Sequence, residues 1–188
     1  MLNHVGTQRV ETSRLILRRF EMTDADDVYR NWVTDPEVSR FWGWEPHTCI
    51  EQTKQCITSW VEEYAKLDTY HWTIELKSIR EPIGYIYLNA IDEADDSISV
   101  HFALGRKHWN KGIMPEACKG VIDFAFSALG VKRIHTLHHI DNPASGRVMQ
   151  KCGMRHVKTA YKDFPDCDQL NGDYCYYEIT TEDWERVT

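Results

Sequence analysis

The stretch at residues 97–126 limits the possible folds of this chain more than any other part of it. Residues 98–104 form a short apolar run that is typical of a strand. A basic turn at residues 106–112 follows, and after it the apolar residues recur at helical spacing as far as Phe126. This order predicts a strand, a cationic turn and a helix.

The basic turn is suited to binding an anion. Backbone N–H groups and the positive end of a helix dipole converge at such a turn, most often on a phosphate. Arg106, Lys107 and Lys111 add positive charge, and Gly112 allows a close approach to the backbone. Pro115 falls in the first helical turn, where its missing N–H costs no hydrogen bond. Basic turns are also common as plain solvated connections, so this turn alone does not identify a phosphate site.

Length and charge set the wider expectations. The 188 residues fit a single domain, residues 1–188, with a core at about 11–184. A formal net charge of −7 argues against broad binding to nucleic acid or to an anionic membrane, and suits a cationic substrate such as an amine. Local positive charge on an acidic protein therefore suggests a local anion site.

The cysteines and the absence of long apolar runs predict the compartment. The six cysteines contain no CxxC pair, and the start of the chain has no secretory signal, so we expect reduced thiols. No apolar run approaches the roughly 20 residues that span a bilayer. We expect a cytoplasmic protein.

The hydrophobic pattern predicts one mixed α/β domain with a βαβ crossover at its centre. Residues 1–10 are expected to be a loose leader, and residues 35–47 an aromatic loop. The tyrosine-rich last strand could pair across a dimer, so both a monomer and a homodimer stay open. Strands are expected at 12–20, 70–76, 82–90, 98–104, 131–140, 154–161 and 173–180, and helices at 23–33, 50–67, 113–126 and 144–152.

Several ordered blocks resemble one enzyme family. The segments RKHWNKGIMPEA and, later, NPASGRVMQKCGM resemble the GNAT superfamily of acetyl-CoA-dependent N-acetyltransferases. The opening TSRLILRRFEMTDADDV resembles its branch of RimJ/RimL ribosomal-protein N-terminal acetyltransferases, and HWTIEL, EPIGYIYL and NGDYCYYEIT fall where that branch places strands. The resemblance implies a mixed, mostly antiparallel sheet that is splayed between two parallel strands, with helices on both faces.

The resemblance also implies a site for acetyl-CoA. The family's pyrophosphate loop reads [QR]-x-x-G-x-[GA]. Here Gly112 is kept, and Trp109 replaces the first, polar residue. Met114 replaces the last, small residue, and its larger side chain would move the loop away from the phosphates. Loop amides would hold the diphosphate, and the strand before the loop would pair with the pantetheine arm. The implied cofactor-binding residues are Phe102, Ala103, Leu104, Trp109, Asn110, Lys111, Gly112, Ile113, Met114, Asn142 and Ser145.

Acetyl transfer needs a neutral amine, a donor for the oxyanion and a proton for the leaving thiolate. By resemblance, the thioester lies between the two splayed strands, Asn142 orients the cofactor arm, and Ser145 is the catalytic proton donor. The alternative is that Asn142 is only a turn residue and that Ser145 only provides a hydroxyl at the start of a helix. Other members use a Tyr where this chain has Met149, and a Glu where it has Leu137.

The general base is left open. His139 shares the face of Leu137 by the alternation of a strand, so it is the favoured catalytic side chain, while water is the working hypothesis. No metal is expected, since neighbouring histidines on a strand point to opposite faces and no Cys or carboxylate completes a set. The candidates for the base are His101, His138, His139 and Glu75.

The function expected is an N-acetyltransferase that moves an acetyl group from acetyl-CoA directly to a primary amine. The acceptor could be a protein N-terminus, a polyamine or an aminoglycoside-like compound, in a pocket walled by Phe41, Trp42 and Trp44 unless these form a buried cluster. The alternative is a non-catalytic acyl-CoA-binding sensor; a peptide-binding scaffold is a third possibility, which the basic turn disfavours. A Rossmann-type nucleotide site is excluded because no GxGxxG follows the first strand.

Overall fold

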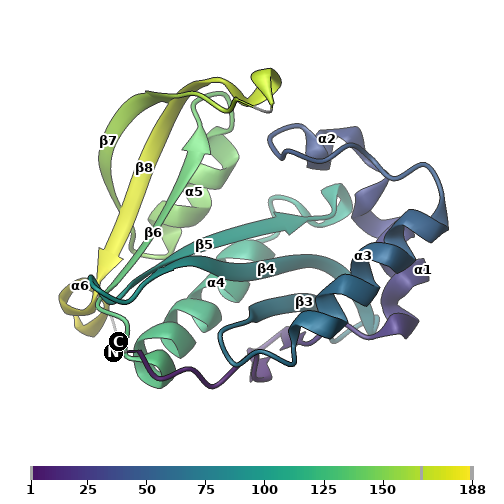
Figure 1. The fold of residues 1–188 in the computed structure, drawn as a ribbon, viewed down its shortest axis with the longest axis horizontal. Coiled ribbons are helices and arrows are strands. Elements are labelled where there is room, and N and C mark those ends of the chain that lie inside the picture. The colour runs from purple at the N-terminus through teal and green to yellow at the C-terminus, as the bar shows by residue number, and fades with distance from the viewer. Residues whose placement is uncertain (1, 166, 187–188) are drawn as a thin grey trace.

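The computed structural model describes residues 2–165 and 167–186, and these form one eight-stranded sheet in the order β1-β2-β3-β4-β5-β6-β8-β7 (Figure 1). Every neighbouring pair is antiparallel except β5 and β6, which are parallel. The predicted fold class is therefore confirmed. The strands are β1 (Val10–Glu11), β2 (Leu15–Arg18), β3 (Tyr70–Leu76), β4 (Glu81–Asp92), β5 (Ser97–Leu104), β6 (Arg133–His139), β7 (Arg155–Lys162) and β8 (Gly172–Thr180).

The sheet opens at its parallel pair. β5 and β6 pair at three positions, the last of which is Ser99 with His135, and then diverge. Beyond that point β5 stays paired with β4 as far as Leu104, and β6 stays paired with β8 as far as His139. The edge of β5 that faces β6 is therefore free of strand pairing beyond Ser99, at the wedge visible in Figure 1.

Helices cover both faces of the sheet. Alternation along β4 sends Ile86 and Leu88 into the core beneath α4, and Tyr85 and Tyr87 to the opposite face beneath α3. α4 buries its apolar stripe, including the fully buried Val121, against the first of these faces. The helices are α1 (Ala25–Val28), α2 (Pro36–Ser39), α3 (Ile50–Glu63), α4 (Ile113–Phe124), α5 (Pro143–Lys151) and α6 (Thr181–Glu185).

The expectation of a loose leader was wrong for the described residues before β1. The Leu2 side chain is buried in the main core. The N–H of Asn3 donates to the carbonyl oxygen of Leu129 at 2.9 Å, and that of Gly6 donates to Leu67 at 2.7 Å. These bonds to residues distant in sequence hold the segment against the domain.

Two helices were not predicted, and one predicted possibility of pairing is excluded. α2 lies inside the expected aromatic loop, where Asp35 caps it by accepting the N–H of Glu37 and Pro36 begins it. α6 follows the last strand and begins with a capping box between Thr180 and Asp183. The possibility that the last strand pairs across a dimer is excluded, because β8 lies between β6 and β7 and both its edges are occupied.

Among the helices in the described part of the chain, none combines the length and the apolar composition needed to cross a membrane.

Candidate active site

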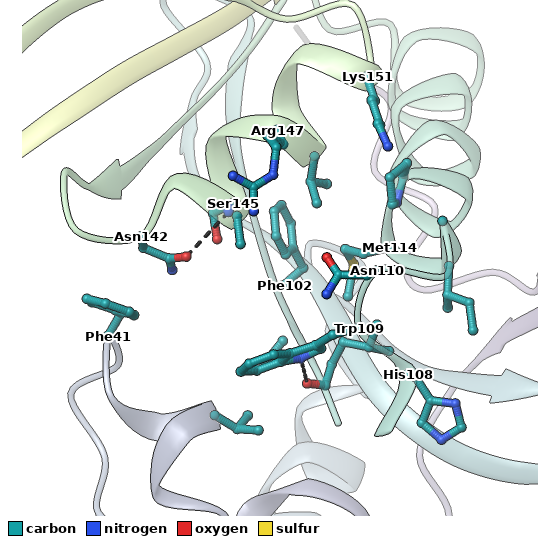
Figure 2. Close-up of a pocket in the computed structure, with 18 of the residues that line it drawn as sticks. Phe41, Phe102, His108, Trp109, Asn110, Met114, Asn142, Ser145, Arg147 and Lys151 are labelled. Carbon is teal, nitrogen blue, oxygen red and sulfur yellow. Dashed lines mark hydrogen bonds between the residues drawn. The ribbon is translucent and has the colours of Figure 1, made fainter. Parts of the chain in front are cut away.

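The loop between β5 and α4 has the backbone shape of an anion cradle. Asn110 and Gly112 both adopt left-handed conformations, with φ of 59° and 71°, and α4 begins directly after them at Ile113. The N–H groups in the first turn of an α-helix have no intrahelical acceptor, so they are available to a ligand. The indole N–H of Trp109 donates to the carbonyl oxygen of Leu104 at 2.7 Å and ties the loop to the end of β5 (Figure 2).

Arg14, the residue just before β2, holds this loop in place. Its guanidinium donates to the carbonyl oxygens of Lys111 at 2.9 Å and Gly112 at 3.0 Å. Glu116, in the first turn of α4, receives hydrogen bonds from Thr12, Ser13 and Arg14. Burial alone would raise the pKa of Glu116, but these hydrogen bonds outweigh it and lower the pKa to about 2. The carboxylate therefore stays ionised and fixes the start of the helix.

A first cavity of about 390 Å³ lies between this loop, the end of β5 and α5. Every implied cofactor-binding residue except Lys111 lines it. Met114 is part of its wall, although most of that side chain is buried in the main core. The predicted loop and the helix that starts at residue 143 therefore meet around one space.

Two cationic side chains that line the first cavity were not predicted from the sequence. Arg147 and Lys151 project from successive turns of α5 toward the cavity (Figure 2). Their spacing of four residues was the available signal, because it places both on one face of a helix. Arg106, expected to add charge to the anion site, instead pairs with Asp35 at 2.9 Å and does not line this cavity.

A second cavity of about 250 Å³ occupies the wedge between β5 and β6. The residues common to both cavities mark the place where they meet. Leu137 and Met149, the positions at which the resemblance implies a Glu and a Tyr in other members, line only the second cavity. The shared residues are Phe41, Trp42, Phe102, Asn142 and Ser145.

Asn142 and Ser145 lie next to each other at the start of α5. The side-chain oxygen of Asn142 accepts the N–H of Ser145 at 3.3 Å and so caps the helix (Figure 2). The sequence alternative for Asn142 was a turn residue, and the structure shows that this turn residue also caps the helix. Its role toward a cofactor stays a prediction. Within residues 2–165 and 167–186, the Ser145 hydroxyl has no hydrogen-bond partner, so it is free to serve a ligand at the junction.

Three of the four candidate bases line the wedge cavity: His101, His138 and His139. The ring of His101 stacks on Tyr87 at 5.1 Å, and its Nε2 lies 2.9 Å from the Ser99 hydroxyl. Burial, with smaller contributions from the nearby cations, lowers the pKa of His101 to about 4. Glu75 lines neither cavity, because its carboxylate binds Arg18 at 2.7 Å.

His139 is held on several sides. Its Nδ1 accepts the N–H of Asp141 at 3.1 Å, and its ring lies 5.7 Å from that of Phe41 and 5.2 Å from that of Tyr174. A Cβ built at Gly172 would come within 2.4 Å of Nε2, which shows how closely the backbone covers that nitrogen. His139 therefore faces the wedge with one nitrogen occupied and the other covered.

Part of the expected aromatic wall is present. Phe41 and Trp42 line the wedge cavity together with Phe164 and Tyr174. Trp44 lies elsewhere, in a third cavity on the α3 side of β4.

Comparison with known proteins identifies the family. The acetyltransferase (GNAT) domain profile matches residues 14–155. The chain is 32% identical over 146 residues to the uncharacterized N-acetyltransferase YoaA of Bacillus subtilis, which covers 78% of this chain and 82% of that protein.

Two solved structures share the fold. The ribosomal-protein-S5-alanine acetyltransferase of Vibrio fischeri has a TM-score of 0.79 at 20% identity and covers 94% of this chain and 98% of its own. The microcin C7 self-immunity acetyltransferase MccE, solved with acetyl-CoA and AMP, has a TM-score of 0.76 at 18% identity and covers 90% of this chain and 93% of its own. The domain profile and the identity to YoaA show that the chain belongs to the GNAT family and is an acetyltransferase.

Proposed function

We propose that this enzyme transfers the acetyl group of acetyl-CoA directly to a primary amine while both substrates are bound. The observation that carries the proposal is that the two cavities meet at Ser145 and Asn142. The first has the cationic lining and helix N-terminus suited to phosphates, and the second has the aromatic lining suited to an acceptor.

The chain's residues fit acetyl-CoA along the first cavity. The N-terminus of α4 and the cations Arg147 and Lys151 suit its phosphates. The unpaired edge of β5 beyond Ser99 offers backbone groups to the pantetheine arm as a neighbouring strand would. The structure of MccE, a protein of the same fold, was solved in complex with acetyl-CoA, which supports acetyl-CoA as the co-substrate.

The chemistry asked of the side chains is modest. The amine nitrogen attacks the thioester carbon, the C–S bond breaks, and the amine loses a proton. An α-amine has an ordinary pKa of about 8, so water can accept that proton. His139, the predicted alternative, has its Nδ1 occupied and its Nε2 covered, which favours water. The Ser145 hydroxyl donates a hydrogen bond to the sulfur and relays a proton from solvent to the leaving thiolate, so that serine is neutral before and after the step, and a backbone N–H of β5 stabilises the oxyanion.

The non-catalytic sensor of acyl-CoA, which the sequence left open, is disfavoured by the match to N-acetyltransferases. Its remaining support is that Met149 and Leu137, where the resemblance implies Tyr and Glu in other members, cannot exchange a proton. The RimJ/RimL-like assignment, with a protein N-terminus as acceptor, and the cytoplasmic location remain predictions. A small amine such as a polyamine or aminoglycoside-like compound is the other acceptor class.

The test is release of the coenzyme A thiol from acetyl-CoA with N-terminal peptides, polyamines and aminoglycosides, beside calorimetric titration of acetyl-CoA. Turnover with one class establishes the enzyme and its acceptor. Tight binding without turnover in any class supports the sensor. Absence of binding contradicts both.

A further inference from the structure

A third cavity, of about 610 Å³, lies between α3 and strands β3 and β4, on the sheet face opposite α4. Its volume is in the range of small-molecule sites. The cavity is open to solvent, and about half of its lining residues carry rings; several of these rings also pack against the second hydrophobic cluster of the protein. The ring-bearing residues that line it are Trp42, Trp44, His47, Trp60, Tyr70, His71, Tyr85 and Tyr87.

This aromatic cavity adjoins the wedge cavity. Trp42 and Tyr87 line both spaces. Tyr87 stacks on His101 in the wedge at 5.1 Å, and on its other side its ring lies 5.6 Å from that of His71 in the aromatic cavity. A continuous row of rings therefore leads from the wedge toward α3.

The charge of the aromatic cavity suits a cation. Glu63 on α3 and Asp68 before β3 both line it, and no Lys or Arg among the described residues does. Neither carboxylate has an ion pair or a side-chain hydrogen bond in the described part of the chain. Faces of Trp and Tyr rings attract cations as well.

His71 adds an unpaired polar atom to the same lining. Its Nε2 is buried and has no hydrogen-bond partner among the described residues. Burial lowers the pKa of His71 to about 3, so the ring is neutral near neutral pH and does not repel a cation. Burial lowers the pKa of His47 as well. His71 Nε2 has almost no accessible surface, so the ring contributes a neutral part of the wall rather than a hydrogen bond to a ligand.

We infer that the aromatic cavity binds the distal part of the acceptor, and that the acceptor is a small organic amine with a second cationic group. This inference rests on the proposed function. One amine reaches the junction at Ser145 through the wedge, and the second cation lies among the rings near Glu63 and Asp68.

The test compares amines matched in carbon chain. Pentylamine and 1,5-diaminopentane differ in the second amino group, and longer pairs of the same kind report the span between the two cavities. We expect kcat/KM for the diamine to exceed that for the monoamine by about tenfold or more, from one cation–ring and two carboxylate contacts. In the double variant Glu63→Gln, Asp68→Asn the ratio should fall to within about threefold of one.

The control is Glu62→Gln, which removes one negative charge next to Glu63 on α3 and outside the cavity, while each single variant, Glu63→Gln and Asp68→Asn, removes one inside it. Glu62→Gln should keep the wild-type ratio. A wild-type ratio near one at every chain length, or a ratio that survives the double variant, would overturn the inference while acetylation of monoamines leaves the proposed function standing.

Calorimetric titration of 1,5-diaminopentane decides the inference even if no amine is acetylated. Binding that the double variant lacks supports the inference, and failure of the wild-type protein to bind the diamine overturns it. Failure of the proposed function would show instead as no thiol release with any amine or peptide.

Discussion

Arg14 Nε donates a hydrogen bond to Glu116 Oε2 at 2.6 Å across 102 positions of sequence, and the same guanidinium holds the carbonyl oxygens of Lys111 and Gly112. One side chain therefore fixes the loop and the start of α4 together. Lysine keeps the charge but cannot reach three acceptors with a planar fork. We expect Arg14→Lys to raise the Kd of acetyl-CoA about tenfold, since the loop amides lose their fixed positions.

Calorimetry measures that change. Arg9→Lys is the control, because Arg9 pairs with Glu11 on the surface and does not line the first cavity. An unchanged Kd in Arg14→Lys would show that the loop keeps its shape without this support.

Gly112 gives a second prediction with a closely matched partner. Gly112 and Gly130 have φ of 71° and 72°, and a Cβ at either meets no atom closer than 3.6 Å. Alanine should destabilise the fold by about 1 kcal/mol at both positions. Only Gly112→Ala should weaken acetyl-CoA binding, by about tenfold, because only Gly112 lines the cavity. Equal affinity in the two variants, measured by calorimetry, would remove the loop from the binding site.

The local parts of this account were predictable from the sequence, and the distant ones were not. β5, the turn at Gly112 and α4 follow from neighbouring residues, and so does the cap of α5 at Asn142. The contact between Arg14 and Glu116 could not be predicted from the sequence, because no local pattern indicates that residues so far apart lie together.

Two errors share that cause. Leu2 lies in a segment with no periodic pattern, and its burial depends on elements formed elsewhere in the chain. β8 shows an ordinary strand pattern whether it lies at an edge or between two strands, and only the folded sheet places it between β6 and β7. The aromatic cavity likewise combines α3, β3 and β4, so no single stretch of the sequence predicts it.

Ser145→Ala tests the proton donor. A thiolate leaves without full protonation more readily than an alkoxide, so we expect kcat to fall about 10- to 100-fold rather than vanish. The Kd of acetyl-CoA should stay within about twofold, since the hydroxyl adds one contact at most. Ser127→Ala is the control: that hydroxyl donates to the Asp123 carbonyl, far from both cavities. Unchanged kcat in Ser145→Ala would assign the proton to water.

His71 links stability to acid. Burial lowers the pKa of His71 to about 3 from an ordinary 6.5. Below pH 6.5, His71 is therefore protonated in the unfolded chain but stays neutral in the folded protein. Stability is therefore lost as the pH falls. At pH 5 the loss is about 2 kcal/mol, because each unit below the unfolded pKa is worth about 1.4 kcal/mol.

Urea unfolding at pH 7 and pH 5 measures this effect in the wild type and in His71→Phe. Phenylalanine fits beside the rings of Phe20 and Trp60 and cannot titrate. The variant's stability should change less between the two pH values, by about 2 kcal/mol. An equal change in both proteins would mean that His71 can be protonated in the folded state.

The most direct measurement is mass spectrometry of an amine panel after incubation with acetyl-CoA that carries a ¹³C-labelled acetyl group. We predict that the ¹³C label appears in an amide on the acceptor nitrogen, and that one free coenzyme A thiol is released for each amide formed. Acetyl-CoA that binds and stays intact with every amine and peptide, or label that leaves only as acetate, would contradict it.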